Sequence, residues 1–159
     1  MRPGDTRRVR WHPIPDPRAL HDSTRHQAPQ TTAFKGGEGC SYAAGLCYFA
    51  TKIDERVWKL DPDRAEIEIV YDLETSEEGL LSGVDNVLAL PSGDVYVAED
   101  PGDMQIVRLT PDGGVAPILQ VMGHYGSEVT GPAFSPDGAR LYFSSQRFPG
   151  TTYEVMGDF

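Results

Sequence analysis

The sequence lacks an apolar run of the ~20 residues that a membrane-spanning helix needs. Arg7-Arg8 is not followed by the apolar segment of an export signal. A Gly-Xaa-Ser-Xaa-Gly elbow, a P-loop and a His-Glu-Xaa-Xaa-His motif are also missing. No segment shows the periodicity of a helical repeat protein. These absences predict no membrane partner, and they leave the localisation of this chain unassigned.

Cysteine is scarce, with two residues in 159, so the sequence does not indicate the disulfide-rich scaffold of a small secreted protein. If residues 44–45 form a two-residue hairpin turn, Tyr42 faces Cys47. Cys40 then lies diagonal to Cys47. Diagonal pairs are about 7–8 Å apart, which exceeds the usual Cα separation in a disulfide. We therefore expect two free thiols.

Positive charge is also in short supply, because 14 Lys and Arg stand against 24 Asp and Glu, a net charge of −10. Six of the arginines lie among the first 26 residues, so the rest of the chain is more acidic still. A phosphate backbone is bound by clustered Lys and Arg, and we predict no nucleic-acid partner. An acidic body is compatible with binding cations.

Glycine and proline are abundant, with 17 and 13 residues, and they indicate many turns. A six-residue strand pattern occurs three times, at residues 45–50, 93–98 and 139–144. The tyrosine at its fourth position recurs at spacings of 48 and 46 residues. A repeat of ~40–50 residues made of four short strands is typical of a β-propeller blade.

The predicted fold class is all-β: an incomplete β-propeller of about two and a half four-stranded antiparallel blades after an extended N-terminal arm. The arm takes residues 1–33, and the partial propeller takes residues 34–159. Its blades span about 38–73, 82–122 and 128–159. A closed propeller takes ~4–8 blades. We therefore expect the missing blades to come from a longer chain or from another subunit.

Glutamate and asparagine occupy equivalent places in the first two blades. Ten residues before the repeat tyrosine, the chain has Glu38 in the first blade and Asn86 in the second. In a propeller this place is the start of the innermost strand, which faces the central channel. A carboxylate and an amide oxygen converging there suit Ca²⁺. The sequence leaves an alternative equally open, in which both side chains cap turns of the inner strands.

The second strand of each blade returns to the same rim. Three residues after the repeat tyrosine lies Glu99, and Glu128 precedes the third blade near this rim. We predict both as further metal ligands, with a polar loop and a turn as the respective alternatives. Arg147 is the predicted catalytic residue, because an arginine beside metal ions can clamp the oxygens of a phosphate ester. His124 is expected on the surface.

Short motifs follow one another from residue 34 onward. They are Phe-Lys-Gly-Gly-Glu-Gly at 34–39, Val-Trp-Lys-Leu at 57–60, Asp-Asn at 85–86, Val-Ala-Glu-Asp at 97–100, Gly-Pro-Ala-Phe-Ser-Pro-Asp-Gly at 131–138 and Leu-Tyr-Phe-Ser-Ser-Gln-Arg at 141–147. In this order and spacing they resemble the C-terminal part of PhoX-family proteins, over roughly residues 8–159.

This resemblance implies a β-propeller alkaline phosphatase that binds calcium and iron at the channel mouth and acts on small phosphate esters. It implies that Glu38 and Glu99 are metal ligands, and that full-length relatives are periplasmic or secreted. The family's metal site also uses a cysteine and other residues from an N-terminal half that has no counterpart here. We therefore expect a fragment that is inactive alone.

Two other functions stay open. A calcium-dependent lactonase of the gluconolactonase type has a similar pattern at Glu38-Gly39 and Asn86, with one Ca²⁺ on the axis. A binding propeller or an inactive remnant would need no complete site. Gln146-Arg147 and the segment 131–138 favour the phosphatase.

Overall fold

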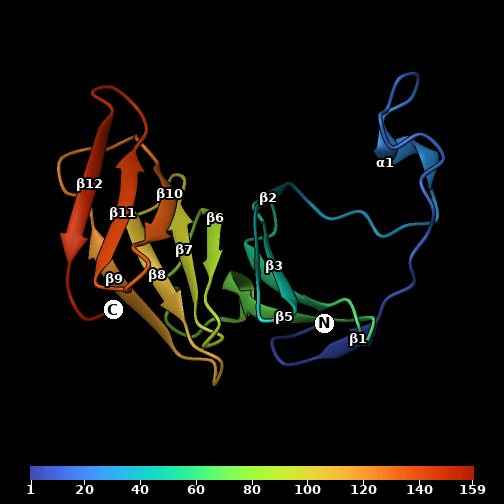
Figure 1. Cartoon of the computed structure of the whole chain (residues 1–159), viewed down its shortest axis with the longest axis horizontal. Coiled ribbons are helices and arrows are strands. Elements are labelled where there is room, and N and C mark those ends of the chain that lie inside the picture. The colour runs from blue at the N-terminus through green and yellow to red at the C-terminus, as the bar shows by residue number, and fades with distance from the viewer.

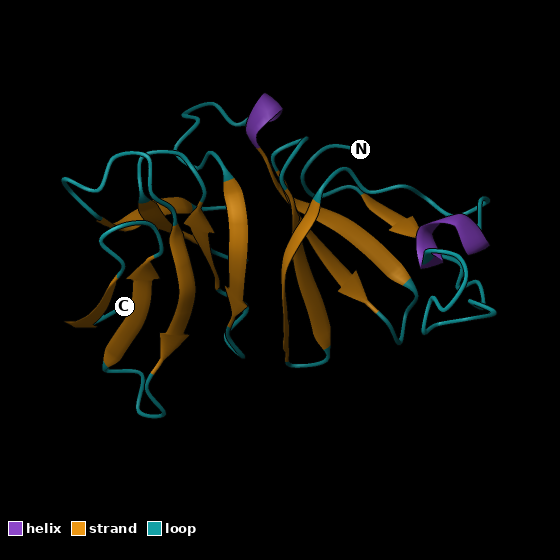
Figure 2. Cartoon of the chain, turned by 90° about the horizontal axis from the view of Figure 1, so that it is seen from above, coloured by secondary structure: helices purple, strands orange, loops and turns teal.

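The structure, a computed structural model, describes residues 1–159 and consists mainly of antiparallel β-sheets (Figure 1). Three sheets follow one another along the chain and stand in an open row, as consecutive propeller blades do (Figure 2). The predicted all-β fold class is confirmed. No helix is long and apolar enough to cross a membrane.

Within each blade the strands pair in chain order. The first blade contains β2 (Gly37–Ala43), β3 (Leu46–Thr51), β4 (Arg56–Asp61) and β5 (Glu66–Asp72). The second contains β6 (Val84–Ala89), β7 (Val95–Glu99), β8 (Gln105–Leu109) and β9 (Val115–Gln120). The third contains only β10 (Val129–Phe134), β11 (Arg140–Ser145) and β12 (Thr151–Met156). A short 3₁₀ turn, η1 (Leu73–Thr75), begins the connection between the first two blades.

The first hairpin shows how local sequence fixes the pairing. Ala44 and Gly45 both have positive φ, 49° and 86°, which is what a two-residue turn needs to match the right-handed twist of its strands. Tyr42 therefore faces Cys47, as predicted. The apolar alternation of β3 then places Tyr48 on the face turned toward the second blade.

The core lies between the sheets. Tyr48 of the first blade belongs to one buried cluster with Val97 of the second, and it is only 4% exposed. Tyr96 of the second blade belongs to another with Phe143 of the third. The repeat tyrosines of the first two blades thus face the following blade. Tyr142, in the last blade, has no following sheet and is half-buried.

The N-terminal arm contains β1 (Thr6–Arg8), which pairs with β5 as a fifth strand of the first blade. It also contains one helical turn, α1 (Thr24–Gln27), that the sequence did not predict. The backbone N–H of Asp16 donates to Oε1 of Gln27, and Nε2 of Gln27 donates to the backbone carbonyl of Asp16, each at 2.8 Å, which closes this part of the arm into a loop. The arm lies on the side of the first blade that faces away from the second (Figure 1).

Candidate metal centre

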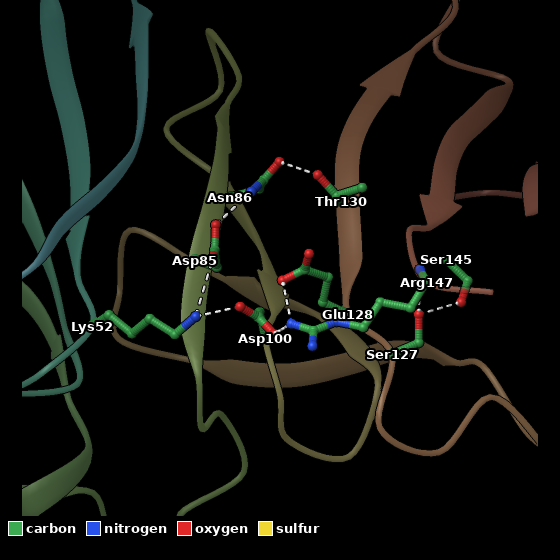
Figure 3. A network of polar contacts seen from close by, with 9 residues as sticks. All are labelled: Lys52, Asp85, Asn86, Asp100, Ser127, Glu128, Thr130, Ser145 and Arg147. Carbon is green, nitrogen blue, oxygen red and sulfur yellow. Dashed lines mark hydrogen bonds and ion pairs between the residues drawn. The ribbon is translucent and has the colours of Figure 1, made fainter. Parts of the chain in front are cut away.

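Three carboxylates from two neighbouring blades meet at one rim of the sheets (Figure 3). Asp85 lies on β6, Asp100 directly follows β7 and Glu128 directly precedes β10. Paired antiparallel strands run in opposite directions, so the start of β6 and the end of β7 share a rim. One carboxylate oxygen from each residue lies within 4.8 Å of the others. Asp100 and Glu128 are each only 8% exposed.

Two cations complete this carboxylate cluster. The Nζ atom of Lys52, in the turn after β3, lies 3.3 Å from Oδ2 of Asp85 and also contacts Oδ2 of Asp100. The Nη2 atom of Arg147, after β11, lies 3.5 Å from Oδ1 of Asp100 and 3.6 Å from Oε2 of Glu128. Three carboxylates and two cations leave one formal negative charge, so the site still attracts positive charge. Side chains from all three blades contribute to it.

The ionisation of the cluster follows from these contacts. Burial alone would lower the pKa of Lys52, but hydrogen bonds to Asp100 and Asp85 outweigh it and raise that pKa. Burial would raise the pKa of Asp100, yet hydrogen bonds with Glu128 and Lys52 hold it below its ordinary value. The pKa of Glu128 is raised, chiefly by its hydrogen bond with Asp100. Asp100 is therefore the more acidic member of the pair.

Asn86, one of the predicted ligands, connects the second blade to the third. Its Oδ1 accepts hydrogen bonds from Oγ1 of Thr130 at 3.0 Å and from the backbone N–H of Gly131 at 2.8 Å. Its Nδ2 donates to Oδ1 of Asp85 at 2.6 Å. Both acceptor positions of the amide oxygen are thus used. Asn86 holds Asp85 in place, and a direct role as a ligand stays a prediction.

The structure does not bring Glu99 or Glu38 into the cluster. Glu99 is 1% exposed, and its carboxylate accepts the backbone N–H groups of Ser82 and Gln105, each at 3.0 Å. Glu38 lies on β2 and is exposed. Its neighbour Gly39 lies against the backbone of β6, at the position of Asp85. The metal-binding roles of Glu38 and Glu99 stay predictions.

A chain of hydrogen bonds lies behind Arg147. The backbone N–H of Arg147 donates to Oγ of Ser127 at 2.9 Å, and Oγ of Ser145 donates to the same atom at 2.9 Å. Nδ1 of His124 lies 2.8 Å from Oγ of Ser145, and Nε2 lies 3.4 Å from the Tyr153 hydroxyl. His124, which was expected on the surface, is half-buried and has hydrogen-bond partners, because the loop before β10 folds back onto β11.

Sequence counting missed two of the three clustered carboxylates by one position each. Asp85 directly precedes Asn86, and Asp100 directly follows Glu99. The pairing of β6 with β7 shifts register within β6, and a bulge changes which side chain faces the rim. The adjacent polar pairs at residues 85–86 and 99–100 were the sequence signal that could have found these two carboxylates. Lys52 carried none.

No protein-family model matches the sequence, and no curated protein matches it. Among solved structures, TolB from Acinetobacter baumannii is 13% identical with a TM-score of 0.58, over 77% of this chain and 30% of TolB. A Bacteroides thetaiotaomicron protein of unknown function is 13% identical with a TM-score of 0.58, over 79% of this chain and 32% of that one. A gluconolactonase from Xanthomonas campestris, 14% identical over 79% of this chain and 60% of its own, has a TM-score of only 0.44.

The chain has the β-propeller fold. It spans about a third of the length of the first two similar structures, 30% and 32%. At 13% identity the similarity to them shows the fold alone. It does not point to the PhoX family in particular.

Proposed function

We propose that this chain is part of a metal-dependent hydrolase, in which Asp85, Asp100 and Glu128 hold a divalent cation at the rim of the propeller. The convergence of three carboxylate oxygens within 4.8 Å of one another carries this proposal. Carboxylate oxygens suit Ca²⁺, whereas the cluster offers no imidazole or thiolate ligand of the kind that favours iron. Calcium is therefore the proposed cation.

The surroundings of the carboxylates fit a cation. The Lys52 ammonium contacts two of the three carboxylates, so the cluster already stabilises positive charge. This ammonium stands on a flexible four-carbon stem, and its side chain is 29% exposed. It can swing out toward solvent when a divalent cation takes over its contacts with Asp85 and Asp100.

Arg147 supplies the second half of the proposed site. Its side chain is 58% exposed while it contacts Asp100 and Glu128, so its remaining donors can reach a substrate. A guanidinium donates paired hydrogen bonds to phosphate oxygens, and the proposed substrate is a small phosphate ester, as in the PhoX family. A bound divalent cation would polarise a substrate oxygen and acidify a water molecule. The backbone hydrogen bond to Ser127 keeps Arg147 in position.

A lactone is the second candidate substrate. The structure offers one carboxylate cluster, which fits the single cation of a gluconolactonase-type lactonase better than several metal ions. Both substrates carry an oxygen that a cation can polarise, so the cation site is common to the two. The phosphate ester and the lactone differ in their need for Arg147, because a lactone has no phosphate group for this arginine to bind.

Calcium binding tests the site. Isothermal titration of the chain with Ca²⁺ should show binding that Asp100→Asn weakens at least about tenfold, since the substitution removes a charged ligand. Asp63→Asn is the matched control, because Asp63 is exposed and lies outside the cluster. Equal affinity in wild type and Asp100→Asn would overturn the site.

Hydrolysis is assayed in a longer protein that contains this chain together with the further blades of a closed propeller. p-Nitrophenyl phosphate should be hydrolysed only with Ca²⁺, and Arg147→Lys should lower kcat/KM, because a lysine loses the paired geometry. Hydrolysis of δ-gluconolactone unaffected by Arg147→Lys would favour the lactonase instead.

A further inference from the structure

The two cysteines lie much closer together than their strand positions suggest. Cys40 on β2 and Cys47 on β3 are diagonal to each other, since Cys47 is paired with Tyr42 and Cys40 with Phe49. Their Sγ atoms are nevertheless only 3.4 Å apart. Both thiols are free, as predicted. Their side chains lean toward each other across the hairpin. A disulfide would shorten the Sγ–Sγ distance to about 2.05 Å and draw the two diagonal positions closer together.

The environment gives the two thiols different roles. Cys40 is exposed, whereas Cys47 is half-buried. Burial, followed by the hydrogen bond with Cys40, raises the pKa of Cys47 to about 11. An external reagent therefore reacts with Cys40 first, and Cys47 is the shielded second thiol beside it.

We propose that Cys40 and Cys47 form a dithiol site that a small disulfide, such as oxidised glutathione, converts to an intramolecular disulfide. In the first step the Cys40 thiolate attacks one sulfur of glutathione disulfide. A mixed disulfide forms, and one glutathione thiolate leaves and takes up a proton. In the second step the Cys47 sulfur, having lost its proton to solvent, attacks Sγ of Cys40. The second glutathione leaves. The chain loses two electrons and two protons, and glutathione disulfide gains both.

The disulfide would lock a particular part of the sheet. The pairing of β2 with β3 shifts register between Gly37 and Cys40, so regular pairing resumes at Cys40. A link from Cys40 to Cys47 would fasten β2 at the end of this irregularity, two residues from Glu38. The carboxylate cluster contains neither cysteine, so the dithiol site does not depend on the proposed hydrolase function.

Mass spectrometry of the intact full-length chain tests the proposal. After incubation with oxidised glutathione, wild type should lose two hydrogens, carry no glutathione and resist alkylation at both cysteines. Cys47→Ser should instead keep one glutathione on Cys40, because no second thiol can release it. Cys40→Ser should react much more slowly, because only the shielded thiol remains. Circular dichroism checks that each variant keeps the strand signal of wild type.

Three results would overturn the proposal. One is wild-type chain that carries glutathione on both cysteines, which would mean that the thiols act independently. Another is wild-type chain whose cysteines both remain open to alkylation after prolonged exposure to oxidised glutathione. The third is a disulfide that forms between chains, seen as a dimer on a non-reducing gel.

Discussion

At the scale of single residues, Glu99 has a structural role, although it directly precedes Asp100 of the carboxylate cluster in the sequence. Burial raises the pKa of Glu99, while backbone N–H donors oppose this rise. Ser82 and Gln105 each donate to one of its two oxygens. We expect Glu99→Gln to lower the free energy of unfolding by about 2 kcal/mol, because the new NH₂ group would face a buried N–H donor. Urea denaturation followed by circular dichroism measures this loss.

Glu38→Gln is the matched control. Glu38 is exposed, and substitutions at such sites usually change the free energy of unfolding by less than about 0.5 kcal/mol. Equal losses in both variants would contradict the structural role of Glu99.

Cys47 gives the chain a dependence on pH in the alkaline range. Burial, and then the hydrogen bond with Cys40, raises its pKa from 9.0 to about 11. Because the folded-state pKa is above the unfolded one, the neutral thiol contributes stability that is present below pH 9.0 and lost as pH rises through about 11. The alkylation rate of Cys47 in the folded chain should therefore keep rising with pH up to about 11.

Iodoacetamide labelling followed by peptide mapping measures this rate. The same chain in concentrated urea is the control, and there the rate should level off near pH 9.0, the ordinary thiol value. Identical profiles in the two states would show that the fold does not protect Cys47.

At the scale of elements, β2 packs closely against β6, the strand that carries Asp85 of the cluster. A Cβ atom on Gly39 would lie 2.4 Å from the backbone oxygen of Asp85 and 2.5 Å from the nitrogen of Val87. Both neighbours are backbone atoms, so one blade would have to move. We expect Gly39→Ala to lower the free energy of unfolding by about 1–3 kcal/mol and to weaken Ca²⁺ binding. Urea denaturation and isothermal titration measure the two effects.

Gly37→Ala is the control on the same strand, since a Cβ atom at Gly37 meets nothing within 4 Å. It should leave the free energy of unfolding and the affinity for Ca²⁺ near the wild-type values. Unchanged Ca²⁺ affinity in a destabilised Gly39→Ala chain would mean that the carboxylate cluster does not depend on how these blades pack.

The repeats in the sequence predicted the strands well and the rim residues less well, for one physical reason. Strands were placed by turn chemistry and alternation, both of which are local. The inner strands β2, β6 and β10 each shift register near their start, where the alternation of faces breaks down. This is the rim at which the carboxylates meet. Glu128 and Arg147 lie in loops outside the strands, and counting along the chain placed them at this rim.

At the scale of the whole molecule, the repeat predicted the number of blades but not the course of the arm. An arm of residues 1–33 without periodicity carries no signal for the face that it covers. In the structure its first residues pair with β5 on the side of the first blade that is turned away from the second, whereas α1 stands apart from the sheet (Figure 1). Val9 packs there beside Trp58 and Ile69. The arm thus covers apolar surface that a preceding blade covers in a closed propeller.

The covering continues at Phe34, the first residue after the arm, and this residue is its sharpest test. Its ring meets the rings of Phe49 and Trp58 edge-to-face, with centroids 5.1 and 5.3 Å away. Phe34→Ser should expose both rings, lower the free energy of unfolding by about 1 kcal/mol or more and promote self-association through the uncovered face. Leu20→Ser removes an exposed apolar residue of the arm, outside every buried cluster, and should change neither property. Sedimentation velocity at several concentrations measures the association. Equal behaviour of the two variants would mean that Phe34 does not shield the first blade.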